Sequence, residues 1–211
     1  SLLPQYRGAA PINWAIINGD KETGITTFFL QHEIDTGEVI QQVRVPIADE
    51  DNVEVIHDKL MSLGGRLVTE TVDAILAGEV KPVPQEELVN LSQGELRPAP
   101  KIFKDTCRID WMKGVKGVYD FVRGLSPYPA AWTELVSADG SLQVLKIFQT
   151  EKNFFSHGEK IGTVSTDGKT YLRVALSDGY LNILSLQLAG KKRMPVADFL
   201  RGFKGEALSV K

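Results

Sequence analysis

A single stripe of apolar residues at helical spacing runs through the first half of the chain. Its members advance by three or four positions at each step: Val53, Ile56, Leu60, Leu63, Leu67, Thr71 and Ala74. This spacing places them on one face of a helix over residues 52–77. Asp51 or Asn52 can cap its first turn, and Gly78 follows its end. The stripe indicates a helix that covers a sheet, and we assign it no chemistry.

Shorter elements precede this helix. Residues 9–19 are typical of a short helix, with a proline in the first turn and a glycine at the end. Residues 24–31 and 39–45 are rich in β-branched and aromatic side chains, which predicts two strands, as a hairpin or as neighbours in a sheet. Asp35, Thr36 and Gly37 make the turn between them. The first half therefore predicts an α/β domain.

The second half has a different pattern. One helix is predicted by a shared apolar face, which ends at Pro127: Val115, Val118, Phe121, Val122 and Leu125. Short alternating strands separated by Gly- and Asp-rich turns follow, over residues 131–136, 143–149, 161–165, 170–176 and 179–188. In the last of these, the alternation places Leu184, Leu186 and Leu188 on one face. This succession, with a short helix after Pro195, favours a small barrel or sandwich.

The two halves also differ in charge. Residues 1–97 hold 7 Lys/Arg and 16 Asp/Glu, a balance of −9, whereas residues 98–211 hold 17 and 11, a balance of +6. A proline-rich segment over residues 79–104 coincides with the change of sign and predicts a partly extended linker. We therefore expect two domains, 1–97 and 98–211. The basic half favours a polyanionic partner such as nucleic acid, and solvated surface charge is the alternative.

Several classes of protein are disfavoured. No apolar run approaches about 18 residues, which argues against a transmembrane helix. The first residues have neither a basic start nor an apolar core, so nothing indicates secretion. Cys107 is the single cysteine, which excludes an internal disulfide, and with three scattered histidines we expect no metal site. These features predict a cytoplasmic protein that does not bind membranes.

Spacing alone gives few candidates for chemistry. Asp35 follows an apolar strand and fits either a turn aspartate that accepts backbone N–H groups or a catalytic carboxylate. His32, His57 and His157 are more typical of surface positions. Residues 1–11 form a loop that enters a helix, and this loop is either a plain connection or a backbone-lined wall for a flat ligand. These alternatives stay open on the pattern alone.

Five segments, in order along the whole chain, resemble the methionyl-tRNA formyltransferase family. They are Ser1–Ile12 (Ser-Leu-Leu-Pro-x-x-Arg-Gly-Ala-Ala-Pro-Ile), Ile34–Gly37, Arg108–Trp111, Pro127–Trp132 and Leu186–Met194. The first two are shared by folate-dependent formyltransferases in general. The last, Leu-Gln-x-x-Gly-Lys-Lys-x-Met, lies in the basic half and favours the tRNA enzymes within that group.

The resemblance implies a fold and a reaction. The fold would be the α/β rear half of a formyltransferase Rossmann-like domain, followed by a small OB-like β-barrel domain with flanking helices. The reaction would pass a formyl group from 10-formyltetrahydrofolate to the amino group of methionyl initiator tRNA, without a metal. In the family an Asn and a His stabilise the developing oxyanion, and an Asp pairs with the His. Asp35 is the position that matches this catalytic Asp.

The resemblance also implies binding residues. The folate site would be lined by Ser1, Leu2, Leu3 and Pro4. The phosphates of tRNA would meet Lys191, Lys192 and Arg193, with Lys101 and Lys104 and, more weakly, Lys113, Lys116 and Arg123 as further candidates. Phosphate contacts of this kind contribute affinity rather than sequence choice.

One departure from the family pattern bears on activity. The family's Asn and His stand just before the Ser-Leu-Leu-Pro segment, with which this chain opens. We therefore expect a C-terminal part of such an enzyme, monomeric and inactive by itself. Two alternatives remain: a formyltransferase with another amine acceptor, or a non-catalytic RNA-binding module that stacks bases on aromatic side chains such as Tyr171 and Tyr180.

Overall fold

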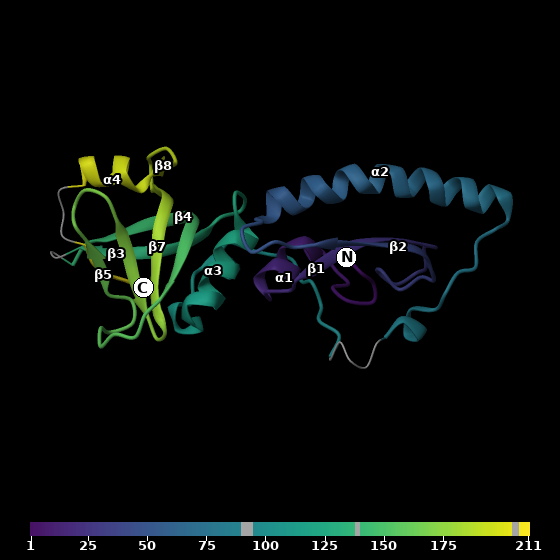
Figure 1. The fold of residues 1–211 in the computed structure, drawn as a ribbon, viewed down its shortest axis with the longest axis horizontal. Coiled ribbons are helices and arrows are strands. Elements are labelled where there is room, and N and C mark those ends of the chain that lie inside the picture. The colour runs from purple at the N-terminus through teal and green to yellow at the C-terminus, as the bar shows by residue number, and fades with distance from the viewer. Residues whose placement is uncertain (90–94, 138–139, 204–206) are drawn as a thin grey trace. The chain divides into compact units, whose positions relative to one another are not determined.

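The chain folds into two compact units, Ser1–Ile102 and Phe103–Lys211, in the computed structural model, which describes residues 1–89, 95–137, 140–203 and 207–211 (Figure 1). The division lies five residues after the boundary expected from composition. None of the described helices is long and apolar enough to cross a membrane.

The first unit is a two-stranded antiparallel sheet with helices packed on it. Its elements are α1 (Pro11–Ile17), β1 (Glu22–Phe28), β2 (Val39–Pro46), α2 (Val53–Ala77) and the 3-10 turn η1 (Gln85–Leu88). The strands are neighbours, with Glu22 opposite Pro46, and α2 runs along the pair (Figure 1). Side chains from α1, α2 and β2, with Ile47 directly after β2, share one core with Tyr6 and Ala99: Ala15, Ile16, Val45, Ile47, Ile56 and Leu60.

Helix α2 has the ends and the buried face that its sequence predicts. The Asn52 side chain accepts a hydrogen bond from Val55 N at 3.0 Å, and Gly78 ends the helix with a φ of +70°. The buried positions Ile56, Leu60, Leu67 and Thr71 all belong to the apolar stripe. Local signals were sufficient here because the stripe lies within the helix and the capping residues directly adjoin it.

The segment after α2 packs back on the first unit instead of leading away from it. Val83 forms an antiparallel bridge with Val39, and Gln85 is buried. Further along, Tyr6 N donates to Arg97 O, and Ala99 N donates to Arg7 O. The described parts of the expected linker are thus hydrogen-bonded parts of the first unit, which explains why that unit extends to Ile102.

The second unit is a nearly closed antiparallel barrel (Figure 1). Its strands are β3 (Ala131–Ser137), β4 (Leu142–Phe154), β5 (Val164–Thr166), β6 (Leu172–Leu176), β7 (Gly179–Leu188), β8 (Met194–Pro195) and β9 (Ala207–Val210). They pair in the order β5-β6-β7-β4-β3-β9, with β8 on β7. A bridge between Thr163 and Ser209, next to a hydrogen bond from Val210 N to Gly162 O, brings the first and last strands of this order together.

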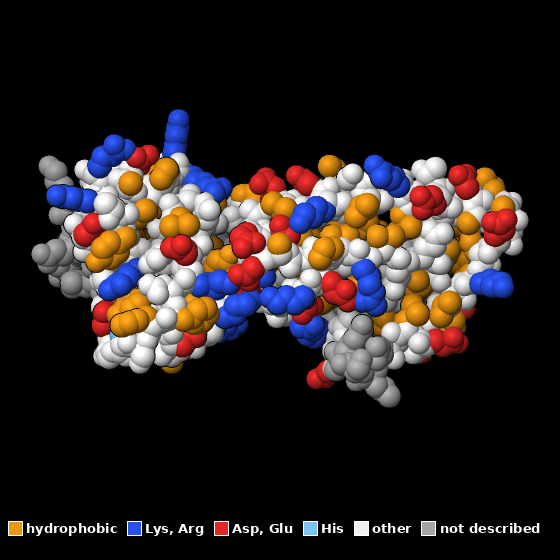
Figure 2. All heavy atoms as spheres, in the orientation of Figure 1, with side chains coloured by type: hydrophobic (Ala, Val, Ile, Leu, Met, Phe, Trp, Pro, Cys, Tyr) orange, Lys and Arg blue, Asp and Glu red, His pale blue; other side chains and the backbone are white. Residues whose placement is uncertain are grey.

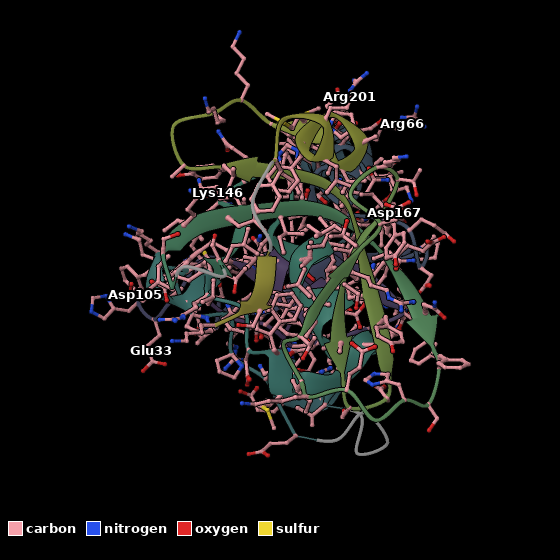
Figure 3. The ribbon with its side chains drawn as sticks, turned by 90° about the vertical axis from the view of Figure 1, so that its left-hand side faces the viewer. Glu33, Arg66, Asp105, Lys146, Asp167 and Arg201 are labelled. Atoms are coloured by element: carbon pink, nitrogen blue, oxygen red, sulfur yellow. The ribbon has the colours of Figure 1, made fainter. Side chains whose placement is uncertain are left out.

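Two helices accompany the barrel. Helix α3 (Gly114–Leu125) packs the predicted apolar face on β4 and β7, with Val115, Val118, Phe121, Val122 and Leu125 all buried. Helix α4 (Val196–Gly202) follows β8, and Arg201 projects from it into solvent (Figure 3). The strands curve around the core of the barrel (Figure 3).

One side-chain orientation in the barrel differs from the expectation. Leu184 is exposed, whereas Leu181, Ile183 and Leu186 are buried. The pairing of β4 with β7 shifts register between Ile147 and Thr150, so that the inward positions change from odd to even numbers along β7. A β-bulge has this effect because it adds one residue to a strand whose side chains alternate.

Candidate functional site

Hydrogen bonds between its backbone and side chains of β1 and β2 hold the loop at residues 1–4 against the sheet. Leu3 N donates to Thr26 Oγ1 at 3.2 Å, and Thr26 Oγ1 donates to Ser1 O at 2.8 Å. Gln42 Nε2 donates to Leu3 O at 2.7 Å. Leu3 and Pro4 are buried, while Ser1 and Leu2 are half-buried. Side chains of β1 and β2 thus fix a loop that has no regular structure of its own.

Gly24 permits the loop to approach β1 closely. A Cβ atom at this position would lie 2.4 Å from Leu2 Cδ2 and 2.2 Å from Val43 O. Real Cβ atoms do not approach other atoms this closely, so any larger residue would push the loop and the strand apart. Glycine is required here by space rather than by conformation.

Asp35 lies beside this loop. Its backbone has a φ of +57°, a left-handed conformation that is unfavourable for residues with a Cβ but tolerated by Asp. Its Oδ2 atom accepts a hydrogen bond from Gly8 N at 3.0 Å. This hydrogen bond joins Asp35 to the residues that follow the loop at residues 1–4.

Gln85 joins Asp35 to the Arg7–Gly8 turn and was missed by the sequence analysis. Its Oε1 atom accepts from Arg7 Nε at 3.1 Å and from the second guanidinium nitrogen at 2.7 Å. Its Nε2 atom donates to Asp35 O at 2.9 Å and to Gly37 O at 2.7 Å. A glutamine within a proline-rich segment gives no pattern that predicts such contacts.

A cavity of about 200 Å³ is also lined in part by the loop at residues 1–4. Its lining shares Leu2 with the predicted folate segment and otherwise comes from Gln5, Tyr6, Asp20, Lys21, Glu22, Thr23 and Arg97. Tyr6 Oη donates to Asp20 Oδ2 at 2.7 Å, and burial followed by this hydrogen bond raises the pKa of Tyr6. Arg97 also pairs with Asp20 at 2.9 Å. These groups satisfy one another and hold residues 95–99 in place.

Three of the predicted tRNA contacts lie in the turn between β7 and β8. Lys191, Lys192 and Arg193 are all exposed, and Figure 2 shows Lys and Arg side chains projecting near α4 and β8. Arg193 Nε donates to Ser185 Oγ at 3.0 Å, and its guanidinium lies 4.6 Å from the centre of the Phe148 ring. The barrel therefore orients the arginine of this turn.

The other basic candidates differ in accessibility. Lys101, Lys104 and Lys113 are exposed, with Lys101 in the first unit. Arg123 is 6% exposed and pairs with the equally buried Asp120 at 2.8 Å, so the expectation that it meets tRNA is wrong. Lys116 pairs with the same carboxylate. A buried charge requires a partner, and on α3 the spacing of three or four residues supplies one.

No group of three or more His, Cys, Asp or Glu side chains placed to hold a metal ion is found in the part of the chain that the structure describes.

The chain matches two domain families of formyltransferases. Residues 1–72 match the family described as formyl transferase, and residues 101–204 match the family described as formyl transferase, C-terminal domain. A curated methionyl-tRNA formyltransferase of Phocaeicola vulgatus is 76% identical over 204 residues, which are 97% of this chain and 63% of that protein. One of Porphyromonas gingivalis is 48% identical over 205 residues, covering 96% of the chain and 62% of the relative. The chain thus spans less than two thirds of the length of these relatives.

Solved structures share the fold at low identity. HypX from Aquifex aeolicus, in complex with tetrahydrofolic acid, has a TM-score of 0.63 at 20% identity and covers 98% of this chain and 37% of its own. The N-formyltransferase from Helicobacter canadensis, in complex with folinic acid and dTDP-3-aminofucose, has a TM-score of 0.59 at 17% identity, covering 91% and 63%. With both domain families matched and relatives at 76% identity, the chain belongs to the formyltransferase family, together with proteins named methionyl-tRNA formyltransferases.

Proposed function

We propose that the protein transfers a formyl group from 10-formyltetrahydrofolate to the amino group of methionyl initiator tRNA, as a cytoplasmic monomer. The observation that carries this proposal is the hydrogen bond at 3.0 Å from Gly8 N to Asp35 Oδ2, which joins the segment at residues 1–12 to Asp35. The resemblance assigns the start of that segment to the folate site and Asp35 to the catalytic carboxylate. The identity of 76% to a curated methionyl-tRNA formyltransferase supports the choice of acceptor.

In this proposal Asp35 holds a proton-transfer group rather than the substrate. The amine must attack the formyl carbon in its neutral form, and the oxyanion that develops needs hydrogen-bond donors. The family supplies these donors with its Asn and His. Gly8 N donates to Asp35 Oδ2, and in this proposal Oδ1 would accept a hydrogen bond from that His. An adjacent carboxylate orients the imidazole and raises its pKa.

The loop at residues 1–4 would contact folate. Its backbone is fixed by Thr26 and Gln42, so the loop presents a preformed wall rather than a mobile one. The half-buried Leu2 supplies apolar surface, and backbone groups near Pro4 supply hydrogen bonds. A flat heterocycle with polar edges suits such a wall.

We also propose the finer description of the fold. The strands and helices of the first unit correspond to the rear half of a Rossmann-like formyltransferase domain. The second unit corresponds to an OB-like barrel, a proposal that its nearly closed antiparallel sheet supports. Functionally, the division into domains separates the acidic unit with Asp35 from the basic unit with the Lys191–Arg193 turn.

The acceptor is tested with a completed protein, defined as this chain joined to the portion of the Phocaeicola vulgatus relative that it does not span. We expect this protein to formylate methionyl-tRNA with 10-formyltetrahydrofolate, because the added portion would supply the Asn and His that the family places before the Ser-Leu-Leu-Pro segment. The measurement is the transfer of labelled formyl to charged tRNA, with uncharged tRNA and a dTDP-amino sugar as control acceptors. Preferential formylation of the amino sugar would contradict the proposed function.

The basic turn is tested by the salt dependence of tRNA binding. Exchange of Lys191 and Lys192 for Ala should reduce the log–log salt slope of the whole chain by about 1 to 2 units, since each phosphate contact contributes roughly 0.7 to 0.9. The stability should change by no more than about 0.5 kcal/mol because both side chains are exposed. The matched control exchanges Lys21 and Lys81 in the acidic unit and should leave the slope unchanged. Equal slopes for the two double variants would show that tRNA binds elsewhere.

A further inference from the structure

The side chain of Gln85 is buried although it belongs to the connection that follows α2. It is 1% exposed and begins the short 3-10 turn η1. The preceding Val83 is bridged to Val39 at the start of β2, which brings the segment under the loop that carries Asp35. A buried carboxamide at this position requires partners for all of its polar groups.

Those partners account for the whole hydrogen-bonding capacity of the carboxamide. Oε1 accepts two hydrogen bonds from the Arg7 guanidinium, and Nε2 donates one each to Asp35 O and Gly37 O. A glutamine side chain has two acceptor lone pairs and two N–H donors, so no capacity is left over. An apolar side chain of the same size would fill the space equally well, but it would leave the carbonyl groups and the guanidinium unpaired.

The network fixes Asp35 from two sides. Of the two carbonyl groups bound by Gln85, one belongs to Asp35 itself and the other to Gly37, two residues further on. Asp35 has a φ of +57°, a conformation that needs support from its surroundings. Arg7, held by the same side chain, directly precedes Gly8, whose N–H binds the Asp35 carboxylate at 3.0 Å. Gln85 therefore controls the position of Asp35 and also that of the group which orients its carboxylate.

We infer that Gln85 is a positioning residue for formyl transfer, acting only through Asp35. This inference rests on the proposed function, because it gives Gln85 a role in the reaction that Asp35 serves. Gln85 itself contacts neither of the proposed substrate sites. A displacement of a catalytic group by about 1 Å can cost up to about 100-fold in rate, so loss of the network should lower kcat while KM for both substrates stays unchanged.

The test is a double-mutant cycle in the completed protein. The variants are Gln85→Leu, Asp35→Asn and the combination of the two, with Gln41→Leu as matched control. Gln41 is a glutamine of the same unit whose Oε1 accepts from Thr71, away from Asp35. Gln85→Leu should lower kcat by up to about 100-fold in the parent protein, and it should have no further effect once Asp35 is replaced. Gln41→Leu should leave kcat unchanged.

Three outcomes separate this inference from the function on which it rests. If Gln85→Leu lowers kcat equally in both backgrounds, the positioning role is overturned and the proposed function stands. If the completed protein does not formylate methionyl-tRNA, the proposed function fails. If it does so and Asp35→Asn alone leaves kcat unchanged, the catalytic role of Asp35 fails, and the role of Gln85 fails with it. Should Gln85→Leu not fold, Gln85→Glu replaces it in the same cycle. Glutamate keeps the size and the contact with Arg7, but it cannot donate to the Asp35 and Gly37 carbonyls.

Discussion

Asp35→Asn in the completed protein is expected to lower kcat for formyl transfer by at least about 100-fold, with little change in tRNA affinity. General acid–base groups contribute about 10²–10⁴-fold, and the asparagine would remove the charge that holds and polarises the histidine. Gly8 N can still donate to the Oδ atom of an asparagine, so the loop should keep its shape. The loss should therefore be in the chemical step.

Single-turnover kinetics and equilibrium tRNA binding measure these two effects separately. Glu33→Gln is the matched control. Glu33 lies two positions before Asp35 and its side chain is exposed, so the substitution removes the same charge without changing Asp35 (Figure 3). This control should retain the parent kcat. If Asp35→Asn instead lowers tRNA affinity and leaves single-turnover chemistry intact, the carboxylate binds the acceptor and is not part of the catalytic machinery.

Gly37→Ala is expected to lower the free energy of unfolding of the first unit by about 1–3 kcal/mol, and to reduce formyl transfer as well. A Cβ atom at Gly37 would lie 1.6 Å from Phe29 O and 2.8 Å from the Phe29 carbonyl carbon. Both atoms belong to the backbone, so neither can swing aside as the end of a side chain could. Phe29 N also donates to Glu38 O at 3.0 Å, so the substitution would separate the strands where the Asp35 loop begins.

Amide hydrogen exchange in β1 and β2 measures this change in the first unit alone, because the chain has two units and a global unfolding transition would combine them. The control is Gly65→Ala on α2, where a Cβ would meet no atom within 4 Å. That substitution should stabilise the unit by up to about 1 kcal/mol, because alanine favours a helix interior. Protection that is unchanged by Gly37→Ala would contradict the close approach of Gly37 and Phe29.

The apolar stripe of α2 predicted its buried face but not the hydrophobic residues on its surface. Hydrophobic side chains also reach the surface along this helix, among charged ones (Figure 2). They include Val55, Met61, Val68, Val72, Ile75 and Leu76. The stripe identifies the face that packs on the sheet, whereas these exposed apolar residues occupy other positions of the helix. Their presence on the surface is recorded by the structure alone.

The sequence predicted the elements whose causes are local. The period of α2, its Asn52 cap and its terminal Gly78 lie within one short stretch. The same is true of the strand predicted at residues 170–176, in which Leu172, Val174 and Leu176 are buried. For the site, the local pattern left Asp35 open between a turn residue and a catalyst. The choice came from the family resemblance, whose folate and tRNA residues remain predictions.

Only the tertiary structure decided the features that depend on contacts between distant residues. Gln85 meets Arg7 and Asp35 across 78 and 50 positions of the chain, and no periodicity within the segment around residue 85 reflects those partners. The exposure of Leu184 depends on a register shift against β4, and the strand β9 depends on pairing with β3. Such contacts form when separate segments pack together, and their partners are therefore absent from any local window of sequence.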